Sequence, residues 1–145
     1  MSQPMSGRLL LAVRPQDRAL VLAALGDEFD YVIAYTMTDA YAAMQGGVAM
    51  VLCGVHFDDG RMFDLLRLAK GDPATADIPF IPVLGEAPVN SAAMADSIRS
   101  AAAALGADGF IDLPAMSSRL GMGPAIDKLR HLARNALSKT PPPRA

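Results

Sequence analysis

The chain of 145 residues has a mass of 15.2 kDa, 52% hydrophobic and 19% charged residues, and a net charge of −2 at pH 7. This length gives one domain with a sizeable core, the composition excludes a disordered chain, and the charge argues against bulk contact with nucleic-acid phosphates. No apolar run reaches the roughly 18 residues of a membrane span, and the start lacks a basic segment leading into an apolar one, so we expect a cytoplasmic protein.

The first half of the chain alternates apolar runs with amphipathic segments. Three runs with strand-forming residues are predicted strands: residues 8–13, 31–35 and 49–53. Two segments with helical spacing, each followed by glycine, are predicted helices: residues 16–25 and 38–45. Thr38 and Asp39 are expected to cap the second helix. The single Cys53, without a partner for an internal disulfide, is expected to be a buried thiol.

The second half continues the alternation. Two strands are predicted at residues 78–84 and 109–112, and three helices at residues 61–70, 90–105 and from Pro124 to residue 137. Pro79 and Pro82 cannot donate to a ladder, so each is expected where no donor is needed. The segment 115–123 is ambiguous. Residues 1–7 are expected to be disordered, and residues 138–145 to form a flexible Pro-rich tail.

Strands that alternate with helices indicate a parallel sheet covered on both faces. We therefore predict one α/β domain over residues 8–137, with a flavodoxin-like (βα)5 architecture and a doubly wound, five-stranded parallel sheet in the order 2-1-3-4-5. Ligand sites of such sheets lie at the carboxyl ends of the strands. There the third apolar run leads into Gly54 and the turn Asp58-Asp59-Gly60, so glycine stands where a chemical group is expected.

The order and spacing of these segments resemble the receiver (CheY-like) domain of bacterial two-component response regulators, over roughly residues 8–137. The resemblance lies in residues 9–13, 51–53 before Asp59-Gly60, 63–67, 78–81, and 106–111 before Pro114. The last two stretches are the more specific. If the resemblance holds, the chain has the receiver fold and a place in two-component signalling or a related phosphorelay.

The resemblance also implies where a phosphorylation site would lie. Receivers hold magnesium with an acidic pair after the first strand and phosphorylate an Asp at the end of the third; these positions correspond to Val13, Arg14 and Gly54. The family's Thr or Ser at the end of the fourth strand corresponds to Leu84, and its Lys before the Pro of the fifth strand corresponds to Leu113. Glycine offers no acceptor, and both magnesium and phosphoryl transfer need charged partners. We therefore expect a degenerate pseudo-receiver without metal or cofactor.

Nearby polar residues have two interpretations each. Arg14 could attract an anion where the metal would lie, or be a solvated side chain. Asp17, Asp58 and Asp59 could hold a cation weakly, although the acidic turn already explains the last two. The loop around His56 looks a little like the Asp-x-His-x-x-Gly loop of cobalamin-binding domains, but it lacks the Asp and its Gly is one residue late, so we assign this histidine no chemical role.

In receivers, the fourth helix, fifth strand and fifth helix form the face that dimerises or meets a partner. The resemblance suggests a protein contact, including a homodimer, through the corresponding residues: Met94, Ala95, Ile98, Ala102, Phe110, Ile126 and Arg130. The alanines of residues 92–104 suit close approach of a partner, or simply helix propensity. A solvated surface explains the basic final helix without nucleic acid.

The sequence therefore predicts a non-phosphorylatable pseudo-receiver that acts as a protein-protein interaction module in bacterial signalling. The alternative is a small-ligand or anion sensor that uses the emptied pocket around Arg14, Gly54, Leu84 and Leu113. An enzyme is not expected, because the chain has no Ser-His-Asp set, zinc-ligand spacing or Gly-rich phosphate loop. No membrane partner is expected either.

Overall fold

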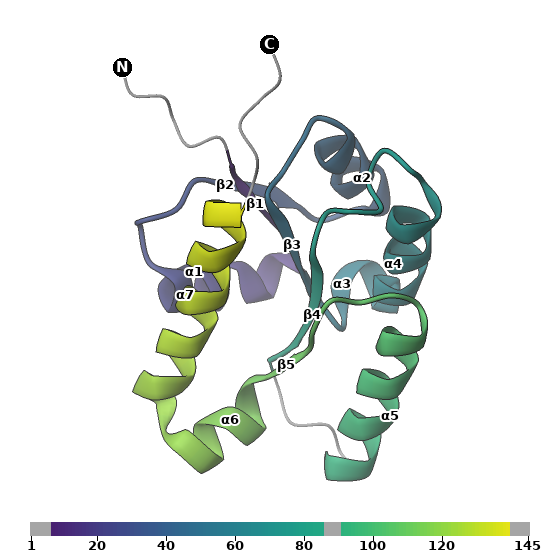
Figure 1. Cartoon of the computed structure of the whole chain (residues 1–145). Coiled ribbons are helices and arrows are strands. Elements are labelled where there is room, and N and C mark those ends of the chain that lie inside the picture. The colour runs from purple at the N-terminus through teal and green to yellow at the C-terminus, as the bar shows by residue number, and fades with distance from the viewer. Residues whose placement is uncertain (1–6, 86–90, 140–145) are drawn as a thin grey trace.

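The computed structural model describes residues 7–85 and 91–139. Its centre is a sheet of five parallel strands in the order β2-β1-β3-β4-β5 (Figure 1). The strands are β1 (Leu9–Ala12), β2 (Tyr31–Ala34), β3 (Met50–Gly54), β4 (Phe80–Leu84) and β5 (Ile111–Asp112). The predicted flavodoxin-like sheet and its strand order are confirmed.

Helices cover both faces of the sheet (Figure 1). One face carries α1 (Arg18–Leu25), preceded by a 3-10 turn (Pro15–Asp17), together with α6 (Leu113–Leu120) and α7 (Met122–Lys139). The other face carries α2 (Met37–Gln45), the short α3 (Phe57–Gly60), α4 (Met62–Gly71) and α5 (Ser91–Ala104). None of the helices described here is long and apolar enough to cross a membrane.

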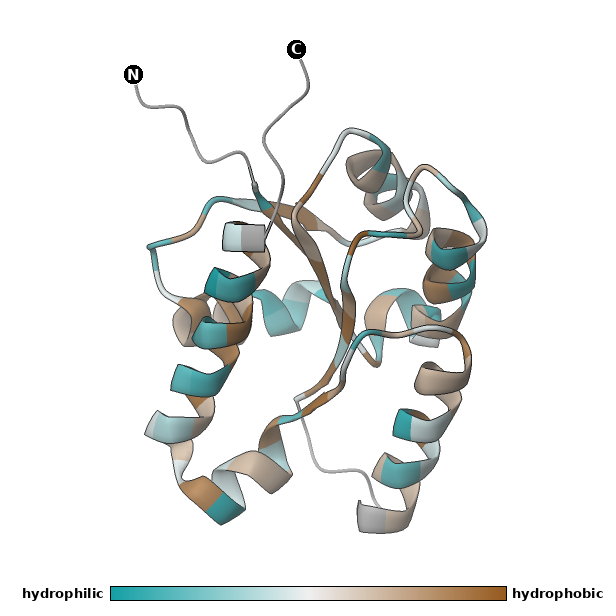
Figure 2. Ribbon diagram, viewed as in Figure 1, coloured by the Kyte–Doolittle hydropathy of each residue, from teal (hydrophilic) through white to brown (hydrophobic). Residues whose placement is uncertain are grey.

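The central strands are apolar along their whole length because both faces of the sheet are buried. All four residues of β1 are 0% exposed, and the hydrophobic colouring of the central strands is clear in Figure 2. Successive side chains point to opposite faces: Leu10 and Val51 enter the core under α2, α4 and α5, whereas Leu11 and Leu52 enter the core under α1 and α7.

The two prolines of the fourth strand are accommodated differently. Pro79 lies just before β4, and its carbonyl accepts from Val51 N at 2.8 Å. Pro82 lies inside β4. The Val83 carbonyl faces β3, where it accepts from Val55 N, so Pro82 faces β5, whose pairing with β4 begins only at Val83. Neither proline interrupts a ladder hydrogen bond, as predicted.

The start of α2 differs from the prediction. The helix begins at Met37, and its cap is Thr36, whose Oγ1 accepts from Asp39 N at 3.2 Å. Thr38 lies inside the first turn, so its assignment as a cap was wrong. Thr36 has the extended backbone of a cap residue, so the helix starts at the next residue, Met37, one residue before the predicted start.

The ambiguous segment after the fifth strand is mostly helical. Asp112 caps α6, because its Oδ1 accepts from Ala115 N at 3.0 Å, and Pro114 lies in the first turn. An additional helix therefore separates β5 from α7.

Several boundaries move. β4 begins at Phe80 rather than residue 78, and β5 at Ile111 rather than residue 109. Ser138 and Lys139 belong to α7 rather than to a flexible tail, and Gly7 is buried rather than part of a disordered start. The predictions for residues 1–6, Asn90 and residues 140–145 fall outside the described residues.

Candidate functional site

The candidate site lies at the carboxyl edge of the sheet, where β1 and β3 are neighbours. The chain leaves β1 toward β2 on one side and returns to β3 on the other, so this is the switch point at which open α/β sheets bind ligands. The register pairs Ala12 with Cys53, Gly54 with Val83, and Leu84 with Asp112. It brings the ends of four strands to one edge.

Four of the five predicted site positions line one small cavity. Val13, Arg14, Gly54 and Leu113 surround a volume of about 40 Å³, room for only a few water molecules. Leu84 does not line it, and its side chain is 1% exposed. A cavity therefore lies where the emptied pocket was expected, but it is very small.

Arg14 and Asp17 form an ion pair at the wall of this cavity. Arg14 Nε donates to Asp17 Oδ2 at 2.7 Å, and Nη2 donates to Oδ1 at 3.1 Å, so the pairing is bidentate. The 3-10 turn that begins at Pro15 places the two residues on the same side. The carboxylate that could have attracted a cation is thus already paired with a guanidinium.

The acidic turn after β3 contacts the N-terminus of α2. Asp58 Oδ2 accepts from Met37 N at 3.0 Å, at the helix N-terminus, where the dipole favours negative charge. Asp58 and Asp59 both have left-handed backbones, with φ of 47° and 58°. His56, in the same loop, is exposed and lies at the wall of the small cavity. The structure supports the interpretation of these aspartates as a turn.

The donor set at this edge does not fit magnesium. The described residues contain no group of three or more His, Cys, Asp or Glu side chains that could hold a metal. Asp17 is the one carboxylate among the residues that line the small cavity, and Arg14 holds it. Magnesium demands several oxygen ligands in near-octahedral geometry, which these residues do not supply.

Cys53 lies behind the site and has no accessible thiol. It is 0% exposed, and burial raises the pKa of its thiol well above the ordinary value. The thiolate is the nucleophilic form, so burial keeps this cysteine in its less reactive thiol form. The prediction of a buried thiol is confirmed.

A second, larger cavity continues from the small one and was missed by the sequence reasoning. It has a volume of about 460 Å³. The two cavities share the lining residues Leu20, Val21, Leu52, Val83, Gly85 and Leu113. No motif marks this cavity, because its lining residues come from the sheet and from three helices that are far apart in the sequence.

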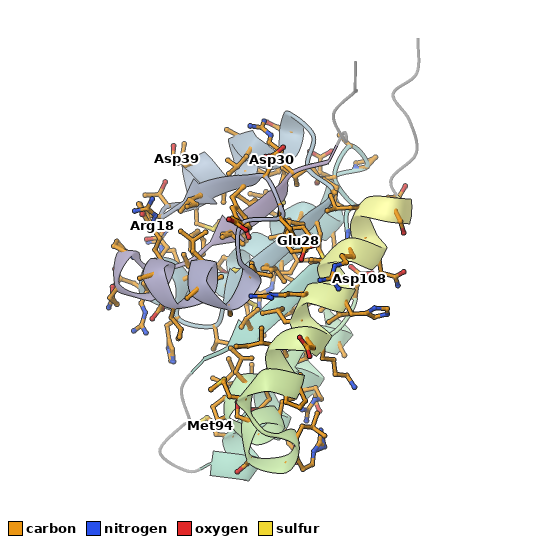
Figure 3. The ribbon with its side chains drawn as sticks, turned by 90° about the vertical axis from the view of Figure 1, so that its left-hand side faces the viewer. Arg18, Glu28, Asp30, Asp39, Met94 and Asp108 are labelled. Carbon is orange, nitrogen blue, oxygen red and sulfur yellow. The ribbon has the colours of Figure 1, made fainter. Side chains whose placement is uncertain are left out.

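The predicted contact face on α5 is partly wrong. Ala95 and Ala102 are 4% and 1% exposed, so they face the core and are inaccessible to a partner. Ile98 packs against the same core, whereas Met94 is 42% exposed, at the lower end of the molecule in Figure 3. The helical period places these alanines inside and this methionine outside.

The other residues of the predicted contact face do not all lie on the same side of the molecule as Met94. Ile126 lines the larger cavity, and Arg130 Nε donates to the Ala24 carbonyl at 2.9 Å, so both belong to the α1 side of the sheet. Phe110 contacts the Arg99 guanidinium, which lies 5.0 Å from the ring centroid. Phe110 is therefore the residue of this group that lies next to α5.

No model of a known protein family matches the sequence, and neither does any curated protein sequence. Solved structures of receiver domains do resemble the fold. The phosphorylated cyanobacterial phytochrome response regulator RcpA has a TM-score of 0.68 at 13% identity, covering 95% of this chain and 99% of that one. The receiver domain of the Pseudomonas aeruginosa sensor histidine kinase PA1611, with magnesium in its active-site cleft, has 0.66 at 12% identity, covering 92% and 100%. The chemotaxis regulator CheY4 of Vibrio cholerae has 0.63 at 16%, covering 88% and 99%.

These likenesses extend over nearly the whole of each chain, and their identities of 12–16% make them likenesses of fold. The chain has the CheY-like α/β fold of response regulator receiver domains.

Proposed function

We propose that the chain is a pseudo-receiver, a bacterial cytoplasmic signalling module that has the receiver fold without its phosphorylation chemistry and acts by binding protein. The Arg14–Asp17 ion pair supports this most strongly. It lies at the switch point beside Gly54, and it pairs the carboxylate that lines the cavity with a guanidinium. Val13, Arg14, Gly54, Leu84 and Leu113 are, on this proposal, the degenerate phosphorylation-site positions.

The proposal gives the chain no enzymatic activity and no cofactor, nucleic-acid or membrane partner. Gly54 presents no nucleophile, and the guanidinium of Arg14 occupies the region where a cation would be needed. Signalling must then come from the abundance or partner of the module rather than from a phosphorylated state.

Treatment with acetyl phosphate tests the proposal directly. We expect intact-protein mass spectrometry to show no added phosphoryl group, with or without magnesium, while a phosphorylatable receiver treated in parallel gains one. A stable acyl phosphate on Asp58 or Asp59 would overturn the proposal, because these are the nearest exposed or half-exposed carboxylates after β3.

The Gly54→Asp variant tests whether the loss is distributed over several positions. A Cβ at Gly54 would have the Ala12 carbonyl and a Val13 methyl as its nearest atoms, both at 3.9 Å, so a side chain fits there. We expect the variant to fold and still gain no phosphoryl mass, because metal ligands, hydroxyl and lysine would still be missing. Phosphorylation of this single variant would show that the assigned register is wrong.

The partner surface, for a signalling protein or a second copy, is proposed around the exposed side of α5 and the neighbouring β5. Met94→Glu places a charge on that surface, and Leu68→Glu on α4 is a matched control, since the two side chains are 42% and 40% exposed. Molar mass by light scattering over a concentration series measures self-association. We expect Met94→Glu, and not Leu68→Glu, to shift it toward monomer; equal effects would contradict the assignment.

The alternative, a ligand or anion sensor at the emptied site, has less support. A volume of about 40 Å³ admits no molecule much larger than a few waters. The cation that would attract an anion is already paired with Asp17.

A further inference from the structure

The cavity of about 460 Å³ is an open recess between the sheet and three helices. Leu52 of β3 and Val83 of β4 form its floor, and residues of α1, α6 and α7 form its walls. Leu52 and Leu129 are 1% and 2% exposed, so the cavity reaches down to core residues. It is a recess in the molecule rather than a flat apolar patch.

The additional helix α6 explains why the recess exists. α1 and α7 meet where Arg130 Nε donates to the Ala24 carbonyl at 2.9 Å. In the chain, α6 lies between β5 and α7 (Figure 1), and residues of α1, α6 and α7 line the recess. Leu20 and Met122, which line the cavity there, are 54% and 58% exposed and mark its opening.

The lining chemistry restricts what fits. No described lining residue of this cavity carries a charged side chain. Its one hydroxyl, that of Ser117, donates to the Met122 sulfur at 3.6 Å. Burial of an unpaired charge here would be very unfavourable. The volume lies within the roughly 300–1,000 Å³ typical of small-molecule sites, which are mostly apolar with a few polar groups.

Position points to a ligand as well. The recess continues into the small cavity at the switch point between β1 and β3, the place where open α/β sheets bind ligands. The Arg14–Asp17 ion pair lies at the wall of that small cavity and supplies polar atoms there. The combined space is therefore apolar over most of its length and polar at one end.

From this arrangement we infer that the recess between α1, α6 and α7 is a binding site for a neutral, mainly apolar small molecule. Its apolar body lies against Leu52, Val83 and Leu129, and any small polar end is directed to the Arg14–Asp17 pair. The site is independent of the proposed loss of phosphorylation, since neither claim requires the other.

Fluorescence titration with N-phenyl-1-naphthylamine, a neutral apolar probe, tests the site. We expect saturable binding to the native chain with a stoichiometry near one, together with a rise in Tm, because a molecule that binds the folded state stabilises it. Ala23 lines the recess and is exposed on α1, so Ala23→Trp adds a large side chain at the wall of the recess from a position outside the core. We expect this variant to bind the probe at least tenfold more weakly.

Matched controls separate the recess from general stickiness. Ala19→Trp adds the same side chain at an exposed position of α1 outside the lining, and it should bind like the native chain. On α6, Ser117→Phe should weaken binding and Ser118→Phe should not. Absence of saturable probe binding, or equal affinity in Ala23→Trp and Ala19→Trp, would overturn the inference. So would self-association that Ala23→Trp abolishes in a chain that binds no probe, because a second copy would then fill the recess.

Discussion

Two consecutive aspartates carry backbone strain next to the candidate site. Asp58 and Asp59 have φ of 47° and 58°, a region that side chains disfavour and that aspartate tolerates better than most residues. Asp58 gains a compensating contact, since its carboxylate accepts from Met37 N at 3.0 Å. Its neighbour is exposed. The two residues thus share a strained geometry but differ in what they hold together.

Glycine substitutions should separate these two roles. Asp59→Gly relieves the left-handed backbone, and we expect a gain of up to about 1 kcal/mol in the free energy of unfolding. Asp58→Gly relieves the same strain but removes the acceptor for Met37 N, which is worth about 1 kcal/mol. Thermal and urea denaturation should therefore rank Asp59→Gly above Asp58→Gly. Equal stability of the two variants, or the reverse order, would contradict a stabilising contact between Asp58 and α2.

At the scale of elements, Lys70 of α4 joins the segments before β4 and β5. Its ammonium donates to the Ala76 and Ile78 carbonyls at 2.9 and 3.0 Å and to Asp108 Oδ2 at 2.8 Å. The same Oδ2 accepts from Phe80 N at 2.8 Å, and Asp108 N donates to the Phe80 carbonyl. One ion pair therefore positions the start of β4 against the loop that leads into β5.

Removing this ammonium should cost more than removing a surface ion pair. Lys70→Met keeps an apolar stem but leaves the two carbonyls without this donor and Asp108 Oδ2 with only the Phe80 amide, so we expect the free energy of unfolding to fall by about 1–3 kcal/mol. Asp64→Ala is the control, because the Asp64–Arg67 pair is 59% exposed on both sides and should change stability by less than about 0.5 kcal/mol.

A double-mutant cycle with Asp108→Ala measures the coupling. We expect the combined variant to lose less than the sum of the two single losses, since both remove the same ion pair. Strict additivity, or a loss in Lys70→Met no larger than in Asp64→Ala, would contradict the positioning role.

The elements show which parts of the structure a sequence can predict. β1 and β3 were predictable because a strand buried on both faces is an apolar run, which needs no knowledge of its neighbours. The start of α2 was not. Thr36 and Thr38 are both good caps, and the Asp58 contact at Met37 N joins residues 21 positions apart. Local pattern identifies an element, whereas a distant contact helps fix where it begins.

The same reason limits the prediction of the site. The strand ends could be aligned from the sequence, and four of the five aligned residues do line one cavity. Its small volume and the Arg14–Asp17 pairing depend on the 3-10 turn, which the sequence reasoning merged into a helix. On α5, Ala95 and Ala102 were assigned to the surface because a helix of small residues gives only a weak apolar stripe.

At the scale of the whole molecule, α7 is held to the start of the fold by an ion pair across 106 residues. Arg134 Nε and Nη2 donate to the two carboxylate oxygens of Glu28, each at 2.8 Å, and Glu28 lies in the segment between α1 and β2 beside α7 (Figure 3). Arg130, one turn earlier, contacts α1. Two arginines of the final helix therefore contact the segment from α1 to β2, beside the buried apolar contacts of Leu129 and Ala133.

This arrangement predicts how stability responds to acid. The hydrogen bonds from Arg134 hold the pKa of Glu28 below its usual value. A carboxyl with a lowered folded pKa stabilises the fold fully above its unfolded pKa, about 4.3, and loses that contribution as pH falls through the folded value. Urea denaturation at pH 6 and at pH 3 should therefore show a smaller acid loss in Glu28→Gln than in the native chain. Arg134→Gln should also reduce the acid loss, but by less, because the charge of Arg130 still lowers the pKa of Glu28. An equal loss of stability in both variants and in the native chain between these pH values would show that the ion pair does not stabilise the position of α7. The apolar contacts of Leu129 and Ala133 would then hold the helix alone.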